Sequence, residues 1–283
     1  MSLLTRVVGT KGELIAEYPG LAAAAWSPDG GRLAALRVKD MAEMMGYYAT
    51  PVVLDLASGV ETEVGPLGFY DTAPAWDPDG RSLAFTCVST VRSVYGADGS
   101  VQSEERMDCH GDGLRVVSVD GSDPRVLLPF SPEDGMYYRN PSWSPMGDTI
   151  AVSSHSDSGD CRGYLLVDAQ TGAVRTCFPL PPPGGLGGRC GSYEDGVSDW
   201  SLDGRHLIYH WEFGAGSNGV WITDAATAEA RLIPIAPASF VTLASSGRHL
   251  AFGAGGFVWA ADLDGSNLTL LAEGYSPAWQ PLP

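Results

Sequence analysis

Positively charged side chains are scarce in this sequence. Its 283 residues include 17 Lys and Arg against 34 Asp and Glu, so the formal net charge is −17, and the only lysines are Lys11 and Lys39. Nucleic acids and anionic membrane surfaces are both bound through clusters of Lys and Arg. The composition therefore excludes nucleic acid as an expected partner. It fits a chain that stays dissolved by charge, or one with a cationic partner.

Long apolar runs are also lacking, because no stretch reaches the roughly 18 apolar residues of a membrane-spanning helix. We therefore expect no membrane insertion. The 36 Gly and 20 Pro exclude a coiled coil, and 44% hydrophobic residues are too many for intrinsic disorder. The first residues, MSLLTRVVGTKGEL, have no apolar stretch behind a basic start. They do not form a secretory signal as written, which favours the cytoplasm unless a leader was removed.

One phrase recurs along the chain, an apolar stretch that ends in Trp and is followed by Ser-Pro-Asp-Gly. Pro presets φ and Gly accepts φ > 0, so the phrase predicts a tight turn between two strands. Successive anchor residues are 36 to 67 positions apart, a spacing typical of stacked β-sheet blades with insertions. The copies are AAAAWSPDGGRLAAL (Ala22–Leu36), APAWDPDGRSLAFT (Ala73–Thr86), NPSWSPMGDTIAVS (Asn140–Ser153), VSDWSLDGRHLIYH (Val197–His210), VTLASSGRHLAFG (Val241–Gly253) and SPAWQPLP (Ser276–Pro283).

Each copy is followed by a second hairpin, so a unit holds four strands, here called A to D. Repeated four-stranded antiparallel units form a β-propeller. The chain begins with a C–D hairpin pattern and ends on a strand A pattern, so we expect the two ends to share a reduced last blade. The predicted fold is all-β, a six-bladed propeller in one domain, residues 1–283. The predicted blades are 21–71, 72–138, 139–195, 196–238, 239–275, and 276–283 together with 3–20.

The repeated phrase resembles the TolB-like or PD40 repeat, a WD40-like β-propeller family, over nearly the whole chain. The resemblance implies that strand A lines the inside of each blade and that its Trp packs against the neighbouring blade. Leu243 replaces this Trp in the fifth copy, and Met146 replaces the turn Asp in the third. The resemblance implies a fold and no particular activity.

Long insertions are predicted to gather on one face of the ring. The A–B and C–D turns are short, whereas the B–C loops (38–50, 88–113, 155–163) and the D–A loops (131–139, 180–196) are long. Long loops in a compact domain often carry function, although a surface tolerates insertions at little cost. Aromatic and polar side chains there suit binding of a peptide or glycan. The predicted ligand-binding residues are Tyr48, Tyr70, Tyr138, Arg139, Asn140, Tyr193 and Trp211.

The five cysteines form no CxxC pair, so a zinc ribbon or finger is not expected. Cys87 with Cys109, and Cys161 with Cys190, would each lie on the long-loop face and could form two disulfides, leaving Cys177 as a buried thiol. Two bridges would place the protein in an oxidising compartment. The alternative is five reduced thiols. Localisation therefore stays open between the cytoplasm and an extracytoplasmic form.

Acidic and imidazole groups also fall in these loops, and they suggest a weak metal site. His110, His155, Asp157 and His210 could hold Ca²⁺ or a transition metal. The other interpretation is solvated loop charge, because no stretch matches the calcium-loop pattern D-x-[DN]-x-[DN]-G. Nucleophile-elbow, P-loop, zinc-protease and dinucleotide motifs are absent as well.

Two functions from different classes follow. The leading hypothesis is a non-catalytic recognition propeller that binds a protein, peptide or glycan on the long-loop face. The alternative is a metal-assisted lyase or hydrolase at the same propeller mouth, since oligogalacturonate lyases resemble this repeat class and use a metal there. A scaffold role in an assembly is a third possibility, and a monomer is assumed.

Overall fold

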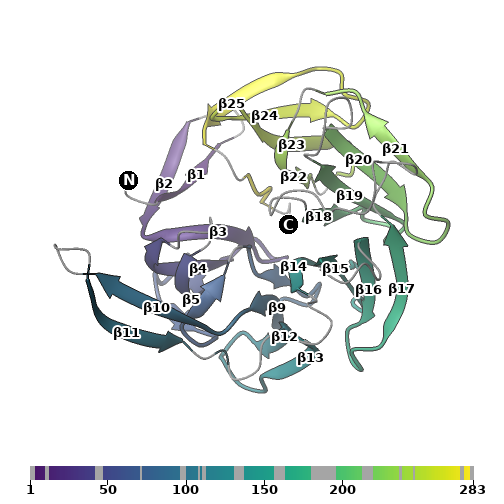
Figure 1. The fold of residues 1–283 in the computed structure, drawn as a ribbon. Helices are drawn as coiled ribbons and strands as arrows, with labels where there is room; N and C mark the ends of the chain where they lie inside the picture. The colour runs from purple at the N-terminus through teal and green to yellow at the C-terminus, as the bar shows by residue number, and fades with distance from the viewer. Residues whose placement is uncertain are drawn as a thin grey trace.

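The structure is a computed structural model of the chain, and its strands form sheets arranged around a ring (Figure 1). It describes residues 4–9, 13–41, 47–70, 72–95, 100–107, 109, 113–130, 137–155, 163–179, 196–211, 219–235, 238–244, 246–274 and 277–280. The described residues contain strands and turns, and no helix long and apolar enough to span a membrane is found among them.

Five antiparallel blades follow one another, each with strand A innermost and strand D at the perimeter (Figure 1). Blade one is β3 (Leu21–Trp26), β4 (Arg32–Met41), β5 (Tyr47–Asp55) and β6 (Glu61–Glu63), with β7 (Gly68–Tyr70) added beside β5. Blade two is β8 (Ala75–Trp76), β9 (Ser82–Cys87), β12 (Gly113–Ser118) and β13 (Arg125–Pro129). Blade three is β14 (Tyr137–Trp143), β15 (Thr149–His155), β16 (Gly163–Asp168) and β17 (Val174–Pro179).

Blades four and five complete the series. Blade four is β18 (Gly196–Trp200), β19 (His206–Trp211), β20 (Gly219–Asp224) and β21 (Ala230–Ile233). Blade five is β22 (Ser239–Leu243), β23 (His249–Ala254), β24 (Phe257–Asp262) and β25 (Thr269–Glu273). Two further sheets have two strands each, β1 (Leu4–Val8) with β2 (Leu14–Pro19), and β10 (Thr90–Tyr95) with β11 (Val101–Met107).

The predicted number of six blades is wrong, because the described residues form five blades, four with four strands and blade one with β7 as a fifth strand. Strands β1 and β2 lie in the ring between blade one and blade five (Figure 1), but among the described strands they pair only with each other. The C-terminal residues Pro277–Gln280 form no strand, although the Gln280 side chain donates to the Gly30 carbonyl (3.2 Å). Proline has no backbone N–H to donate to a sheet. Among the described residues, the predicted joint blade therefore has no strand ladder with the C-terminal segment.

The repeated turn explains how each blade starts. In blade one the Gly30 N–H donates to the Ser27 carbonyl (2.9 Å), and Asp29 Oδ1 accepts from the Gly31 N–H (3.0 Å). Gly30 has φ of +68°, a region that an L side chain rarely adopts. The same glycine position has positive φ at Gly80, Gly147, Gly204 and Gly247.

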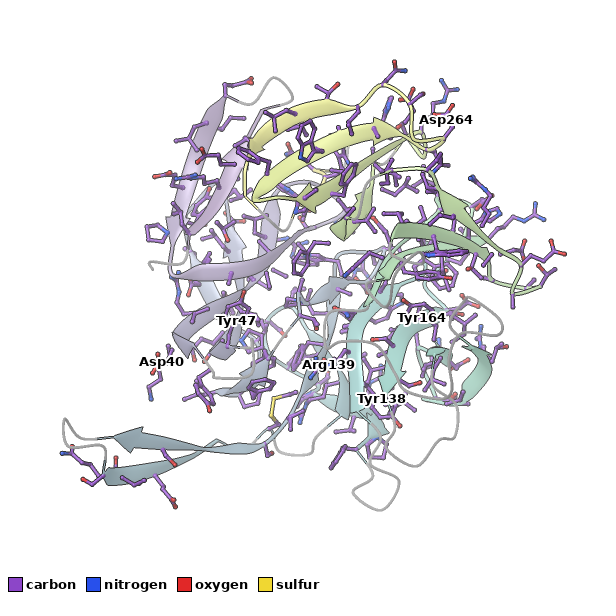
Figure 2. All side chains as sticks on the ribbon, turned by 45° about the horizontal axis from the view of Figure 1, so that its top comes forward. Asp40, Tyr47, Tyr138, Arg139, Tyr164 and Asp264 are labelled. Atoms are coloured by element: carbon purple, nitrogen blue, oxygen red, sulfur yellow. A yellow bond between two sulfur atoms is a disulfide. The ribbon has the colours of Figure 1, made fainter. Side chains whose placement is uncertain are left out.

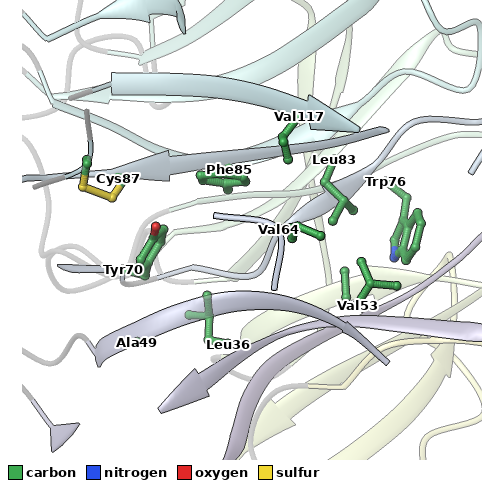
Figure 3. Close-up of a cluster of buried hydrophobic side chains, with 12 residues drawn as sticks. Leu36, Ala49, Val53, Val64, Tyr70, Trp76, Leu83, Phe85, Cys87 and Val117 are labelled. Atoms are coloured by element: carbon green, nitrogen blue, oxygen red, sulfur yellow. A yellow bond between two sulfur atoms is a disulfide. The ribbon is translucent and has the colours of Figure 1, made fainter. Parts of the chain in front are cut away.

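Apolar side chains of neighbouring blades form shared cores. The core between blades one and two contains Leu36 and Val53 on one side and Leu83 and Phe85 on the other (Figure 3). Tryptophan adds a polar contact to this packing, as the family resemblance implies. The Trp76 indole N–H donates to the Ala25 carbonyl of blade one (3.0 Å). The Trp200 indole donates to Ser142 of blade three in the same way (3.0 Å).

Blade five lacks this indole, and a carboxylate supplies the contact instead. Asp199 of blade four accepts from the Thr242 hydroxyl (3.0 Å) and from the Leu243 N–H (2.9 Å), both in blade five. It also accepts from the Trp200 N–H (2.9 Å). Burial raises the pKa of Asp199 despite these hydrogen bonds. Asp199 therefore joins the innermost strands of the two blades at the one anchor position that carries leucine.

Replacing Asp199 by asparagine should lower the free energy of unfolding by about 1–2 kcal/mol, because one backbone donor then faces the amide NH₂. The pKa of Asp199 is higher in the folded than in the unfolded state. Its contribution to the free energy of unfolding is therefore largest below the unfolded-state pKa of about 4, and it falls as the pH rises through the folded-state pKa. Denaturant titrations at pH 4 and pH 7 check this. The difference between wild type and variant should be larger at pH 4, and an equal or smaller difference there would contradict it.

Candidate recognition face

Two faces of the ring differ in the length of their connections. The A–B and C–D turns form one face, here called the turn face, and the B–C and D–A connections form the other, here called the loop face. The B–C connection of blade two contains the hairpin β10–β11, which projects away from the ring (Figures 1 and 2). The long insertion predicted over 88–113 thus has regular structure of its own. Asp40, Tyr47, Tyr138 and Arg139 lie on the side of the ring from which it projects (Figure 2).

Blade one contributes aromatic side chains to the loop face. The half-buried Tyr48 meets Phe69 of β7 edge to face, with ring centroids 6.3 Å apart. Burial raises the pKa of the neighbouring Tyr47. Tyr70 lies inside, 1% exposed, and its hydroxyl donates to the Pro66 carbonyl (2.7 Å). Tyr70 therefore belongs to the core between blades one and two, because it fills the space above Phe85, and it cannot contact a surface ligand.

Blade three places three predicted residues together. Tyr138, Arg139 and Asn140 are half-buried at the loop-face end of β14, the innermost strand. The Ser153 hydroxyl donates to the Arg139 carbonyl (2.9 Å), which fixes the backbone there. A register shift follows between Arg139 and Ser142, and Asn140 has φ of +50°. Such a bulge re-aims side chains and is common beside functional sites.

The same distortion recurs in two other blades. Ala23 and Phe240, like Asn140, stand three residues before their anchor and have φ of +50°. Phe240 is 42% exposed, and its ring lies beside that of His210 with centroids 5.9 Å apart. Sequence analysis missed Phe240 as a surface residue. Phe240 stands three positions before Leu243, as Asn140 does before Trp143, and this shared repeat position is the signal that could have identified it.

Other predicted site residues lie deeper or outside the described residues. His210 is 3% exposed and so stands in the wall of blade four. His155 and Trp211 end β15 and β19 at the loop face, but their side chains are not described. Within the described part of the chain, no three His, Cys, Asp or Glu side chains are grouped as a metal site. The metal prediction stays a prediction. Tyr193, His110, Asp157, Cys161 and Cys190 lie outside the described residues.

A disulfide joins Cys87 and Cys109, as predicted, with Cα atoms 6.0 Å apart. Both residues are buried, and a Cβ added to Gly68 of blade one would lie 2.6 Å from the Cys87 sulfur. Beside them, Phe69 and Val88 exchange two backbone hydrogen bonds of 3.3 Å between the two blades. The disulfide therefore closes the base of the β10–β11 hairpin, and its two sulfur atoms pack against Gly68 of blade one.

Comparison with known proteins supports the fold and no more. No family model matches, and no curated protein matches the sequence. Among solved structures, a TolB of Acinetobacter baumannii has a TM-score of 0.62 at 17% identity over 94% of this chain, which spans 60% of that protein. A structure from Agrobacterium tumefaciens assigned to TolB has a TM-score of 0.65 at 18% sequence identity. The match covers 95% of this chain and 89% of that protein. An oligogalacturonate lyase of Vibrio parahaemolyticus has a TM-score of 0.51 at 12% sequence identity. The match covers 92% of this chain and 68% of that protein.

The chain is therefore a β-propeller. More narrowly, its fold is TolB-like, as the repeated phrase had indicated.

Proposed function

We propose that this propeller is a non-catalytic recognition module that binds a segment of a partner protein on its loop face. The observation that supports this most is the pair of bulged innermost strands, β14 and β22. They present Arg139, Asn140 and Phe240 on backbone that is already fixed. Tyr48 and Phe69 extend the same face in blade one.

These side chains suit a peptide better than they suit a reaction. Aromatic rings and arginine supply most of the energy at protein interfaces, since they bury much area at low entropy cost. A guanidinium pairs best with a carboxylate, and Arg139 lies at the loop-face end of β14. We propose that the bound segment carries an acidic side chain beside an apolar one.

The test uses two variants, Arg139→Ala and Phe240→Ala. A displayed library of random peptides is selected on the wild-type propeller and counter-selected on the double variant. Peptides that survive should contain an acidic residue near an apolar one. Each single variant should weaken their binding at least tenfold, as expected for interface hot spots. Fluorescence anisotropy measures the dissociation constants, and a glycan array run in parallel tests the sugar alternative.

Asp264→Asn is the control, because Asp264 lies in a C–D turn on the turn face and asparagine keeps the Oδ1 acceptor for the Ser266 N–H and hydroxyl. It should bind every selected peptide as wild type does, and all three variants should keep the wild-type unfolding midpoint. A library from which no peptide separates wild type from the double variant would refute the proposed surface. Glycan binding that is lost in the double variant would keep the surface and change the ligand.

The disulfide between Cys87 and Cys109 is compatible with an extracytoplasmic form. We propose an oxidising compartment as the place where the protein works.

A further inference from the structure

A cleft on the turn face lies between blades four and five, away from the loop-face residues proposed above. Its volume is about 560 Å³. The buried Ile208, Ile222 and Leu243 line it as apolar walls. Polar groups at its rim come from the turns of both blades. They are Ser201, Asp203, His206, Asp224, Glu229, Arg231 and Gly247.

The gap between blades one and two shows what fills this position elsewhere in the ring. There Trp76 occupies the anchor position, and the guanidinium of Arg32 lies over its ring, 5.0 Å from the centroid. The Arg32 guanidinium donates to the Gly80 carbonyl (2.8 Å) and lies 3.5 Å from Asp29 Oδ2. The guanidinium is thus held between one turn carboxylate and the turn glycine of the next blade.

Repeat alignment maps that arrangement onto the cleft. Asp203 corresponds to Asp29 and Gly247 to Gly80, and both line the cleft. The two filling groups are replaced by smaller ones, since His206 stands in the place of Arg32 and Leu243 in the place of Trp76. The acceptors of the Arg32 guanidinium are therefore kept, whereas the imidazole of His206 replaces the guanidinium at that repeat position.

The carboxylates of Asp203 and Asp224 accept hydrogen bonds through Oδ1. Asp203 Oδ1 accepts from the Arg205 N–H (3.0 Å) and Asp224 Oδ1 from the Thr227 N–H (2.8 Å), which shapes their turns. Among the described residues, no hydrogen bond reaches Oδ2 of either carboxylate. The hydrogen bond from the Ser201 hydroxyl lowers the pKa of Asp203, and backbone donors lower that of Asp224, so both are ionised at neutral pH. With Glu229, three carboxylates line the cleft beside one guanidinium, Arg231, and the imidazole of His206, whose Nδ1 lies 4.0 Å from Asp203 Oδ1.

We propose that this cleft binds an arginine side chain of a partner protein. The apolar walls take the aliphatic stem, and Asp203 and Asp224 take the planar guanidinium through their Oδ2 atoms. The cleft volume of about 560 Å³ leaves room for an arginine side chain. This second surface does not depend on the loop-face proposal, because it lies on the opposite face and binds the opposite charge.

The test is methyl NMR of the whole chain with labelled Ile and Leu, because Ile208, Ile222, Leu243 and Leu263 report from the cleft itself. The probe is a pentapeptide, Gly-Gly-Arg-Gly-Gly with blocked ends, and its matched control carries citrulline, the uncharged isostere, in place of arginine. The arginine peptide should shift these four methyl signals in a saturable manner. The citrulline peptide should bind at least tenfold more weakly.

Three variants complete the design. Asp203→Asn with Asp224→Asn keeps the Oδ1 acceptors of both turns and should weaken the arginine peptide at least tenfold. The matched control is Asp29→Asn with Asp55→Asn, which removes two charges at the same repeat positions of blade one and should bind within twofold of wild type. Leu243→Trp restores the anchor of the other blades and should abolish binding. If the Leu243→Trp variant does not fold, the two pairs of Asp→Asn variants test the proposal without it.

Several outcomes would overturn the proposal. They are cleft methyl signals that do not move, equal binding of the two peptides, and equal losses in the two charge variants. Agmatine binding as tightly as the peptide would assign the cleft to a free guanidine. Self-association that is lost in the Asp203/Asp224 variant would assign it to a second copy of this chain, and both results would refute a partner protein.

Discussion

Replacing Gly172 by alanine should lower the free energy of unfolding by about 3–5 kcal/mol, because two penalties add. Gly172 has φ of +73°, where a side chain costs about 1–2 kcal/mol. The new Cβ would also lie 2.2 Å from the Leu127 carbonyl oxygen. Leu127 belongs to β13 of blade two, whereas Gly172 lies in the C–D turn of blade three. The blades would have to move apart. Denaturant titration of both proteins measures the difference.

The matched control is Gly59→Ala. Gly59 occupies the same turn position in blade one, since its N–H donates to the Asp55 carbonyl (2.8 Å) as that of Gly172 donates to Asp168 (2.9 Å). Its φ is +71°, but an added Cβ meets nothing within 4 Å. Blade four already carries Ala228 at this position, with φ of +61°. We expect a loss of about 1 kcal/mol for Gly59→Ala. Equal losses at both glycines would contradict a contact between blades.

The same kind of contact recurs in blades two and five. A Cβ on Gly121 would lie 3.1 Å from the Glu63 carbonyl, and one on Gly265 would lie 3.0 Å from that of Pro234. In each case the C–D turn of one blade approaches the outermost strand of the preceding blade. Turn chemistry alone predicts φ > 0 at these glycines. It does not predict the approach of a neighbouring blade, which depends on how the blades are packed.

The sequence predicted the blade because its signals are local. A tryptophan, a tight turn and alternating strands each depend on residues that are close together, and Trp76 and Trp200 join neighbouring blades as expected. Closure of the ring is not local. The last phrase, SPAWQPLP, resembles strand A of the other copies, but Pro277 and Pro281 each lack a backbone N–H donor for a sheet. Repeat counting therefore gave six blades where the structure has five.

The placement of residues on the proposed recognition face was predictable where position in the repeat decides which end of a strand they occupy. Tyr48, Tyr138 and Arg139 lie at the loop-face ends of strands. Tyr70 was misassigned because β7 turns back along β5 and carries its ring into the core, a pairing with no turn signal in the sequence. Phe240 was missed because its exposure results from the bulge in β22, which places an apolar residue outward.

Removing the disulfide through Cys87→Ala and Cys109→Ala should lower the free energy of unfolding by about 2–4 kcal/mol. The two cysteines are 22 positions apart, so the bridge closes a loop that includes both strands of the β10–β11 hairpin. Both sulfurs also pack against Gly68 of blade one, so their loss leaves a gap between two blades. Denaturant titration of the oxidised wild type, the reduced wild type and the variant measures the effect.

The reduced wild type separates the bridge from the packing, because it keeps both sulfur atoms and loses only the covalent bond. It should lie between the oxidised protein and the double variant. Hydrogen exchange at Phe69 and Val88 should quicken in both altered forms, since their two hydrogen bonds of 3.3 Å lie beside the bridge. Exchange at Phe252, in the core of blades four and five, should not change. Equal stability of the oxidised and reduced proteins would show that the packed sulfurs, and not the bond between them, hold blade two to blade one.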